Sequence, residues 1–378
     1  MKARTTIFIA EKLYTTEMNK LLLVFLLSLF TAKATAQDAE VYPWTLRANA
    51  QYGLLLPEYG FMNYIADDYI SAVEINVLKQ TSGENYWQQL YRYPAWGVSF
   101  YYSTMGSSSQ FGNQFTIYPY YKLHIAGRKR FKLSYQMGVG ASYATKKFDR
   151  ENNYMNVAIA THLNIHYHAD LLLEAKLTNR IAANAGLAFN HISNANLGEP
   201  NVGLNFATVY AGLNYSFGKP EKIRRDSIPV FKPEINYSVM ITGGIKHTRT
   251  FESFKYPAMS VSFNASRRAG HKFAFGIGAD FFWDSSVEDQ MTRLQKPFKP
   301  QYSYMTGIHF TQEFIYNKFS LLVQEGFYLG LRERLNNYFM YNRAMVRWRF
   351  NPHLFANVSM KSHLYILDFP EVGIGYVF

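Results

Sequence analysis

The sequence predicts an all-β protein, a transmembrane antiparallel up-and-down β-barrel of about 16 strands. From Tyr42 onward, segments of about ten to fifteen residues alternate apolar and polar side chains, as barrel strands with two different faces do. Aromatic residues are abundant, with 30 Tyr and 30 Phe in 378 residues, and they favour strands and membrane-interface girdles. The chain also ends on an alternating segment whose apolar stripe reaches Phe378. Together these observations favour a membrane barrel over a soluble all-β domain.

Residues 1–36 are predicted to be a signal peptide with an extended N-terminus. Residues 18–20 supply a charged start, residues 21–30 are apolar, and residues 34–36 (Ala-Thr-Ala) fit the cleavage site of a secretory signal. The apolar run is too short to cross a bilayer as a helix. The exported, mature chain is therefore expected to begin at Gln37.

Eight strands are expected on each side of a polar linker at 219–233. The first eight belong to a half that spans 37–218, and the last eight to a half that spans 234–378. The first group is expected at 43–56, 70–80, 95–106, 114–126, 131–147, 157–174, 181–193 and 204–218. The second group is expected at 234–248, 256–269, 271–284, 301–316, 318–330, 338–350, 353–366 and 370–378.

A single wide barrel is the favoured way to close these strands, and an eight-stranded barrel followed by a second barrel half is the alternative. In the last strand, Val372, Ile374 and Tyr376 alternate with small residues before the terminal Phe378. This pattern resembles the recognition signal of barrels that are inserted into the bacterial outer membrane, and its single occurrence favours one barrel. However, residues 215–218 (Tyr-Ser-Phe-Gly) would make a plausible older terminus, which keeps the alternative open. Both arrangements predict a location in the outer membrane.

Three polar side chains interrupt the apolar face of one expected hairpin. The odd positions of strand 181–193 are apolar as far as Phe189, and the same parity then brings His191 and Ser193 to that face. Asn205 begins the next strand on the same face, across the hairpin. With a periplasmic N-terminus, this seventh strand ends at the outer surface. The three side chains are therefore expected on the lipid-facing wall at the level of the outer leaflet.

Around this hairpin the sequence resembles the lipid A 3-O-deacylase / acyloxyacyl hydrolase family of outer-membrane β-barrels. The family pattern is a His-x-Ser-Asn-Ala stretch, a Pro-Asn loop, and a Gly-Leu-Glu whose glutamate completes a Ser-His-Glu triad. The residues that match at the same spacing are His191, Ser193, Asn194, Ala195, Pro200, Asn201, Gly203 and Leu204. The sequence departs from the pattern at the acid, because Asn205 stands in place of the glutamate.

The resemblance implies a serine esterase that hydrolyses an ester-linked acyl chain of lipid A. Ser193 would be the nucleophile, and His191 the general base that takes its proton. Asn205 can orient the imidazole through its side-chain oxygen, although it lacks the full charge of a carboxylate. Glu199, in the intervening loop, is the alternative acid. The oxyanion donors implied by the resemblance lie in the same loop, at Asn194, Ala195 and Asn196.

The expected partners are lipid A or lipopolysaccharide and the outer membrane. A net charge of +12 suits phosphate-rich molecules, and export conflicts with a nucleic-acid partner. No cofactor and no metal are implied, and the absence of cysteine fits a barrel that relies on hydrogen-bonded strands. The alternative functions are a non-catalytic porin and a lipopolysaccharide-binding barrel. The oligomeric state and the acyl position are left open.

Overall fold

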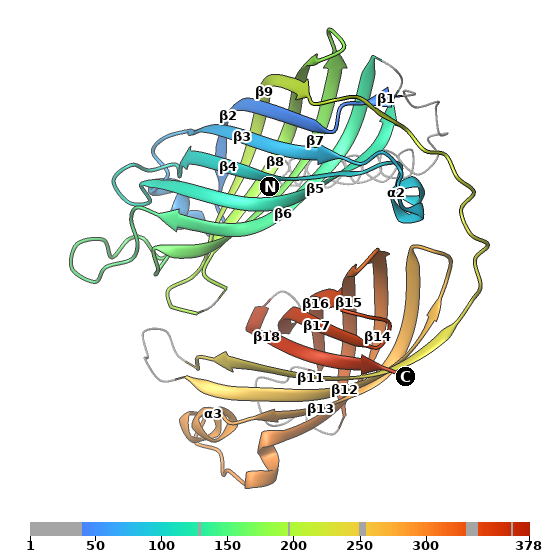
Figure 1. Cartoon of the computed structure of the whole chain (residues 1–378). Helices are drawn as coiled ribbons and strands as arrows, with labels where there is room; N and C mark the ends of the chain where they lie inside the picture. The colour runs from blue at the N-terminus through green and yellow to red at the C-terminus, as the bar shows by residue number, and fades with distance from the viewer. Residues whose placement is uncertain (1–39, 128–129, 196, 249–254, 330–338, 364–365) are drawn as a thin grey trace, which may run out of the picture.

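The computed structural model describes residues 40–127, 130–195, 197–248, 255–329, 339–363 and 366–378. The predicted signal peptide, residues 1–36, lies outside the described residues. The described chain forms two closed antiparallel barrels of eight strands, joined by a linker (Figure 1). None of the helices in the described ranges is long and apolar enough to cross a membrane.

The first barrel closes in sequence order from β2 to β9. Its strands are β2 (Trp44–Leu56), β3 (Ile70–Gln80), β4 (Ala95–Thr104), β5 (Asn113–Gly127), β6 (Phe131–Ala144), β7 (Leu163–Lys176), β8 (Ile181–Ser193) and β9 (Leu204–Phe217). The second barrel closes from β11 to β18. Its strands are β11 (Ile235–Lys246), β12 (Tyr256–Arg268), β13 (Phe273–Asp284), β14 (Tyr304–Tyr316), β15 (Phe319–Leu329), β16 (Met340–Arg349), β17 (Leu354–His363) and β18 (Ile366–Val377).

The all-β prediction of about 16 barrel strands is confirmed, but the preference for a single barrel was wrong. The first barrel closes where Trp44 of β2 pairs with Phe217 of β9, and the second where Val239 of β11 pairs with Tyr376 of β18. Each half therefore pairs its own first and last strands and leaves no open edge for the other half. The terminal-like segment at 215–218 was the signal for this arrangement.

Shorter elements lie outside the barrels. The two-residue strands β1 (Glu40–Val41) and β10 (Glu221–Lys222) pair with each other, which ties the linker to the start of the described chain. Among the described residues, two short helices occupy loops, α2 (Tyr86–Leu90) between β3 and β4 and α3 (Val287–Arg293) between β13 and β14. Two 3-10 turns also occur in loops, η1 (Gly60–Tyr64) and η2 (Pro300–Ser303). The periodicity of the sequence did not predict either helix.

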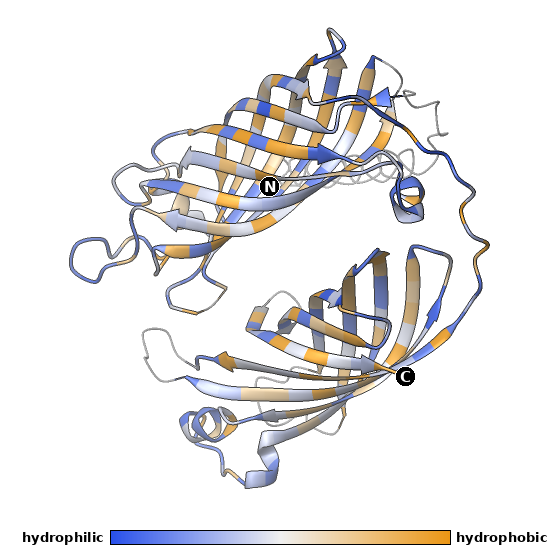
Figure 2. Ribbon diagram, viewed as in Figure 1, coloured by the Kyte–Doolittle hydropathy of each residue, from blue (hydrophilic) through white to orange (hydrophobic). Residues whose placement is uncertain are grey.

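Each barrel presents apolar side chains outward and polar side chains inward. On β3, for example, Val73, Ile75 and Val77 are exposed on the outer wall, whereas Glu74 and Asn76 are buried in the lumen. Hydrophilic residues (blue) and hydrophobic residues (orange) alternate along the strands of both barrels (Figure 2). This polarity is the reverse of a soluble barrel and suits an outer wall in contact with lipid.

Polar side chains fill the lumen of the first barrel. Glu74 accepts hydrogen bonds from Asn49 and Gln51, each at 3.1 Å, as well as from Ser99 and Tyr118. An eight-stranded barrel is just wide enough for side chains to fill its interior. These bonds satisfy the buried carboxylate, which would otherwise be costly in so dry an interior.

The lumen of the second barrel is centred on Arg343, which is fully buried. Its guanidinium donates to Glu371 at 2.8 Å, to Asp280 at 3.0 Å and to Ser260 at 2.7 Å. His309 shares the same carboxylate of Asp280 at 2.7 Å. Arg343, Asp280, Glu371 and His309 are thus mutually paired, and these charges stabilise each other only while the network is complete.

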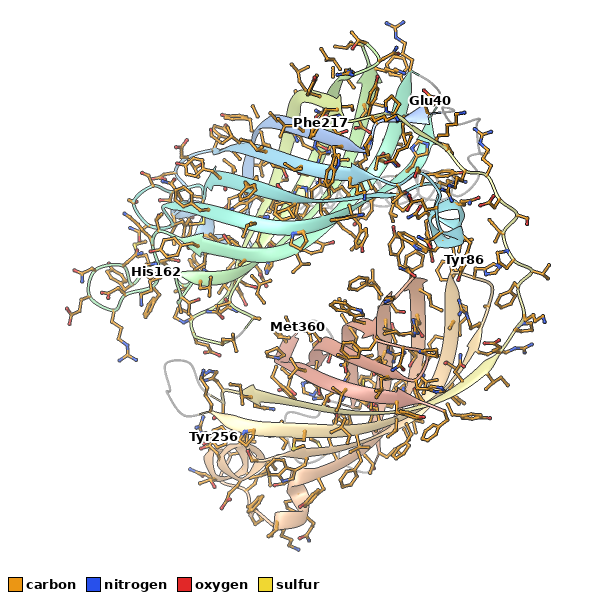
Figure 3. All side chains as sticks on the ribbon, viewed as in Figure 1. Glu40, Tyr86, His162, Phe217, Tyr256 and Met360 are labelled. Carbon is orange, nitrogen blue, oxygen red and sulfur yellow. The ribbon has the colours of Figure 1, made fainter. Side chains whose placement is uncertain are left out.

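The connections at the two ends of each barrel differ in length. In the first barrel, the connections at 57–69, 105–112, 145–162 and 194–203 share one end, and those at 81–94, 128–130 and 177–180 share the other, where two of the three are very short. In outer-membrane barrels the longer loops are extracellular and the shorter turns periplasmic, so we assign this end as extracellular. The equivalent ends of the two barrels lie on the same side in Figure 1, and the linker runs past the opposite, periplasmic ends. His162 and Tyr256 mark the extracellular ends in Figure 3.

Candidate active site

Three polar side chains lie together on the outer wall, His191 and Ser193 at the end of β8 and Asn205 at the start of β9. His191 pairs directly with Asn205 across the hairpin. The neighbouring Asn190 and Ile192 are fully buried in the lumen, whereas His191, Ser193 and Asn205 are only partly buried. The structure thus places the three side chains on the lipid-facing side at the extracellular end, where strand parity predicts them.

A continuous hydrogen-bond relay joins the three side chains. His191 Nε2 lies 2.9 Å from Ser193 Oγ, and His191 Nδ1 lies 2.7 Å from Asn205 Oδ1. An amide oxygen only accepts, so Nδ1 carries the ring proton and donates it to Asn205. Nε2 is then unprotonated and accepts the hydrogen bond of the serine hydroxyl. This is the tautomer that a general base for serine requires.

Glu199 does not take the place of the missing acid in this structure. Both ring nitrogens of His191 are already engaged, one by Ser193 and the other by Asn205. Glu199 lies in the 194–203 loop, and its side chain is partly buried. The structure therefore places Asn205, rather than Glu199, where a triad has its orienting residue.

Asn194 holds the loop after the serine. Its backbone N–H donates to Asn201 Oδ1 at 2.9 Å, and its side-chain amide donates to the carbonyl of Gly198 at 2.8 Å. The side chain is buried, and both donor groups serve the loop itself. Ala195 follows with a positive φ of 54°, which turns the chain sharply. Asn196, the remaining expected oxyanion residue, lies outside the described residues.

The site loop rests on a second extracellular loop and on an apolar core. The N–H groups of Val202 and Gly203 donate to the carbonyls of Val157 and Ala158, at 3.3 and 2.9 Å. Behind the site, Ile192 belongs to a buried cluster at the extracellular end of the lumen, together with Leu55, Ile70, Met105, Phe111, Leu204 and Phe206. Packing of this kind holds the backbone of the two site strands in place.

Gly203 has a role that the sequence pattern did not reveal. It adopts a φ of +80°, and a Cβ at this position would lie 2.8 Å from His191 Cε1. The glycine therefore leaves the space that the imidazole occupies. Asn201, which matched the motif without an assigned role, orders the residue next to Ser193 by accepting the Asn194 N–H.

No group of three or more His, Cys, Asp or Glu residues among the described residues could hold a metal ion. The lumen histidines His166 and His168 face away from the site, on the inner side of β7. His168 bonds Asn190 at 2.7 Å and Asp170 at 3.0 Å, so it belongs to the luminal network.

Two family models match the sequence, one for each barrel. The model described as lipid A 3-O-deacylase (PagL) matches residues 72–214. The model described as acyloxyacyl hydrolase, C-terminal domain, matches residues 235–378. No curated protein matches the sequence.

Among solved structures, the outer membrane enzyme PagL aligns at 16% identity with a TM-score of 0.30. That alignment covers 44% of this chain and 97% of the PagL chain. Neisserial surface protein A aligns at 10% identity with a TM-score of 0.33, over 46% of this chain and 97% of its own. With a family model on each barrel, the chain belongs to the lipid A 3-O-deacylase / acyloxyacyl hydrolase family of bacterial outer-membrane β-barrels.

Proposed function

We propose that the protein is a serine esterase that hydrolyses an ester-linked acyl chain of lipid A. The observation that carries this proposal is the Ser193–His191–Asn205 relay on the outer wall of the first barrel. A hydroxyl, a base and an orienting group at hydrogen-bond distances are the minimal parts of an activated serine. Their position at the extracellular end supports a substrate in the outer leaflet.

The reaction proceeds in two halves. Ser193 Oγ attacks the ester carbonyl carbon while His191 Nε2 takes the hydroxyl proton, and the carbonyl oxygen becomes negative. His191 then gives the proton to the leaving alkoxide of the sugar or of the hydroxyacyl chain, the C–O bond breaks, and an acyl-serine remains. A water molecule, deprotonated by His191, attacks this ester; the acyl–Oγ bond breaks, His191 returns the proton to Ser193 Oγ, and the fatty acid leaves. Asn205 keeps the imidazole oriented throughout.

The oxyanion role falls to the backbone at Ala195. The side-chain amide of Asn194 is engaged with Gly198, so this amide would have to break a loop bond to serve the substrate. A backbone N–H carries no such conflict, and donors aimed at the developing charge contribute about 10²–10³ in rate. We therefore keep Asn194 as the residue that shapes the loop.

Apolar side chains surround the relay on the outer wall. In the neighbouring strand β7, Ile165 pairs with Ser193 and Tyr167 pairs with His191. Phe189 lies two residues before His191 in β8, on the same face, and is exposed, as are Ile165 and Leu163. A surface of this kind can receive an acyl chain by the hydrophobic effect and bring its ester to the serine.

Mass spectrometry of lipid A from cells that produce the protein tests the proposal. Wild type is expected to yield lipid A that has lost one acyl chain, whereas Ser193→Ala is expected to yield the unmodified pattern. Ser193→Ala removes a single oxygen from a partly buried position, so the barrel should still assemble. Identical acyl patterns in the two strains would refute the esterase.

The second candidate is a barrel that binds lipopolysaccharide without cleaving it. Asn205 favours this reading, because a neutral amide stabilises the imidazolium less than a carboxylate does. A porin is less well supported, since polar side chains fill both described lumens. Salt-sensitive binding of lipid A with no change in its mass would favour the binding barrel.

A further inference from the structure

A cavity of about 300 Å³ lies far from the relay, at the periplasmic end of the second barrel. Its floor is the mouth of the barrel lumen, with the inward-facing Arg268, Glu313, Arg347 and Arg349. Its roof is α2 of the first barrel, with Tyr86 and Trp87. We call this cavity, defined by these six residues, the periplasmic vestibule.

The roof is fastened to the second barrel by aromatic contacts. The Trp87 ring meets the Tyr316 ring edge-on with centroids 5.5 Å apart, and the Tyr91 ring lies 4.6 Å from the same ring. The Tyr91 hydroxyl donates to the carbonyl of Ile315. Tyr86 lies between the two barrels on the side of the linker (Figure 3). The vestibule is therefore built by both barrels, and aromatic side chains form one of its walls.

The floor carries more positive than negative charge. Three arginines (Arg268, Arg347 and Arg349) face two glutamates, Glu313 and the more exposed Glu234. Arg349 is satisfied, because it donates to Glu313 and to Ser320. Three formal positive charges and two formal negative charges give the vestibule a net charge of one positive unit.

Arg347 and Arg268 are the guanidinium groups with unused donors. Arg347 is 5% exposed, reaches Glu313 only at 3.5 Å, and stacks on the Phe355 ring at 4.1 Å. Arg268 donates to the carbonyl of His271 at 2.9 Å. In both residues the buried Nε has no hydrogen-bond partner among the described residues. A buried donor without a partner is costly, and a bound anion would remove that cost.

We infer that the periplasmic vestibule is a binding site for a small organic anion, a carboxylate or phosphate carried on a flat apolar body. Arginine presents a planar fork that matches both oxyanions, and Arg347 and Arg268 supply it here. Tyr86 and Trp87 supply a wall against which a ring can pack. The volume is at the small end for ligand pockets, which suits a single ring with one oxyanion. This site is independent of the esterase proposal.

Binding can be measured with the full chain in detergent micelles through the fluorescence of Trp87. The probes are phenyl phosphate and benzoate, which separate the two oxyanions, and benzyl alcohol is the neutral control. Saturable fluorescence changes are expected with at least one anion and not with benzyl alcohol. Trp87→Phe should abolish the signal, because the other four tryptophans lie outside the vestibule.

Arg347→Gln and Arg268→Gln are each expected to weaken binding about tenfold or more, as the loss of a charge-assisted hydrogen bond does. Arg267→Gln is the matched control, because Arg267 is the adjacent residue of β12 and is exposed on the other face. If Arg347→Gln does not give a folded barrel, Arg268→Gln decides alone. Absence of a saturable response to either anion would overturn the inference. An equal affinity in wild type and the folded arginine variants would overturn it as well.

Discussion

Replacing Asn205 by aspartate should make the protein a faster esterase. Aspartate has the same shape as asparagine, so its carboxylate oxygen can keep the 2.7 Å distance to His191 Nδ1. The change adds the negative charge that the neutral amide lacks. Aspartate matches the length of asparagine, whereas glutamate is one methylene longer, and aspartate is therefore the cleaner substitution.

The expected gain follows from the two kinds of hydrogen bond. A neutral hydrogen bond contributes about 1 kcal/mol, and one to a charged group about 1.5–3 kcal/mol. The difference between these two bond energies applies when the His191 ring becomes an imidazolium in the transition state. A change of about 1.4 kcal/mol in activation free energy corresponds to a factor of ten in rate. The gain of about 0.5–2 kcal/mol therefore predicts that kcat rises about two- to thirtyfold. The tautomer is already correct in the wild type, so the larger losses known for wrongly oriented triads do not apply.

The assay is the initial rate of acyl release from lipid A in micelles at saturating substrate. Asn201→Asp is the matched control, because it adds the same charge to the loop just before Asn205 but accepts from Asn194 rather than from His191. Its rate should stay near that of wild type. If folded Asn205→Asp is no faster than wild type, the role of Asn205 as the orienting residue is refuted.

Two further substitutions test the space around the site histidine and the luminal network of the second barrel. Gly203→Ala should lower kcat at least tenfold, because its Cβ displaces the His191 ring and misplacement of about 1 Å can cost up to ~10² in rate. Gly270→Ala is the control, since it has a similar φ of +92° with open space around it, and an equal loss of activity there would contradict the steric explanation. Arg343→Ala should destabilise the second barrel by about 3–5 kcal/mol, because it removes the guanidinium that pairs with two buried carboxylates. Urea unfolding in micelles measures this, and a cost no larger than that of the exposed Arg267→Ala would contradict the network.

The strands were predictable because alternation is a local property of the sequence. The expected strand 181–193 coincides with β8, and its parity placed His191 and Ser193 on the outer wall. The closure of the strands was not predictable in this way. Whether β9 pairs with β2 or continues into a wider barrel depends on partners more than a hundred residues apart, which no local pattern encodes.

The limits of the site prediction have the same origin. The expected strand 157–174 begins only at Leu163, because the preceding residues form a loop that accepts hydrogen bonds from Val202 and Gly203. The sequence offered both Asn205 and Glu199 as the third member of the relay. Only the register of β8 against β9, which sets His191 opposite Asn205, distinguishes them.

The isotopic composition of the fatty acid released in ¹⁸O-labelled water tests the central claim most directly. If an acyl-serine at Ser193 is hydrolysed, the wild-type protein should release a fatty acid with one ¹⁸O and leave the lipid A hydroxyl unlabelled. Ser193→Ala should release none. Equal release by Ser193→Ala, or ¹⁸O in the lipid A hydroxyl, would contradict nucleophilic catalysis by this serine.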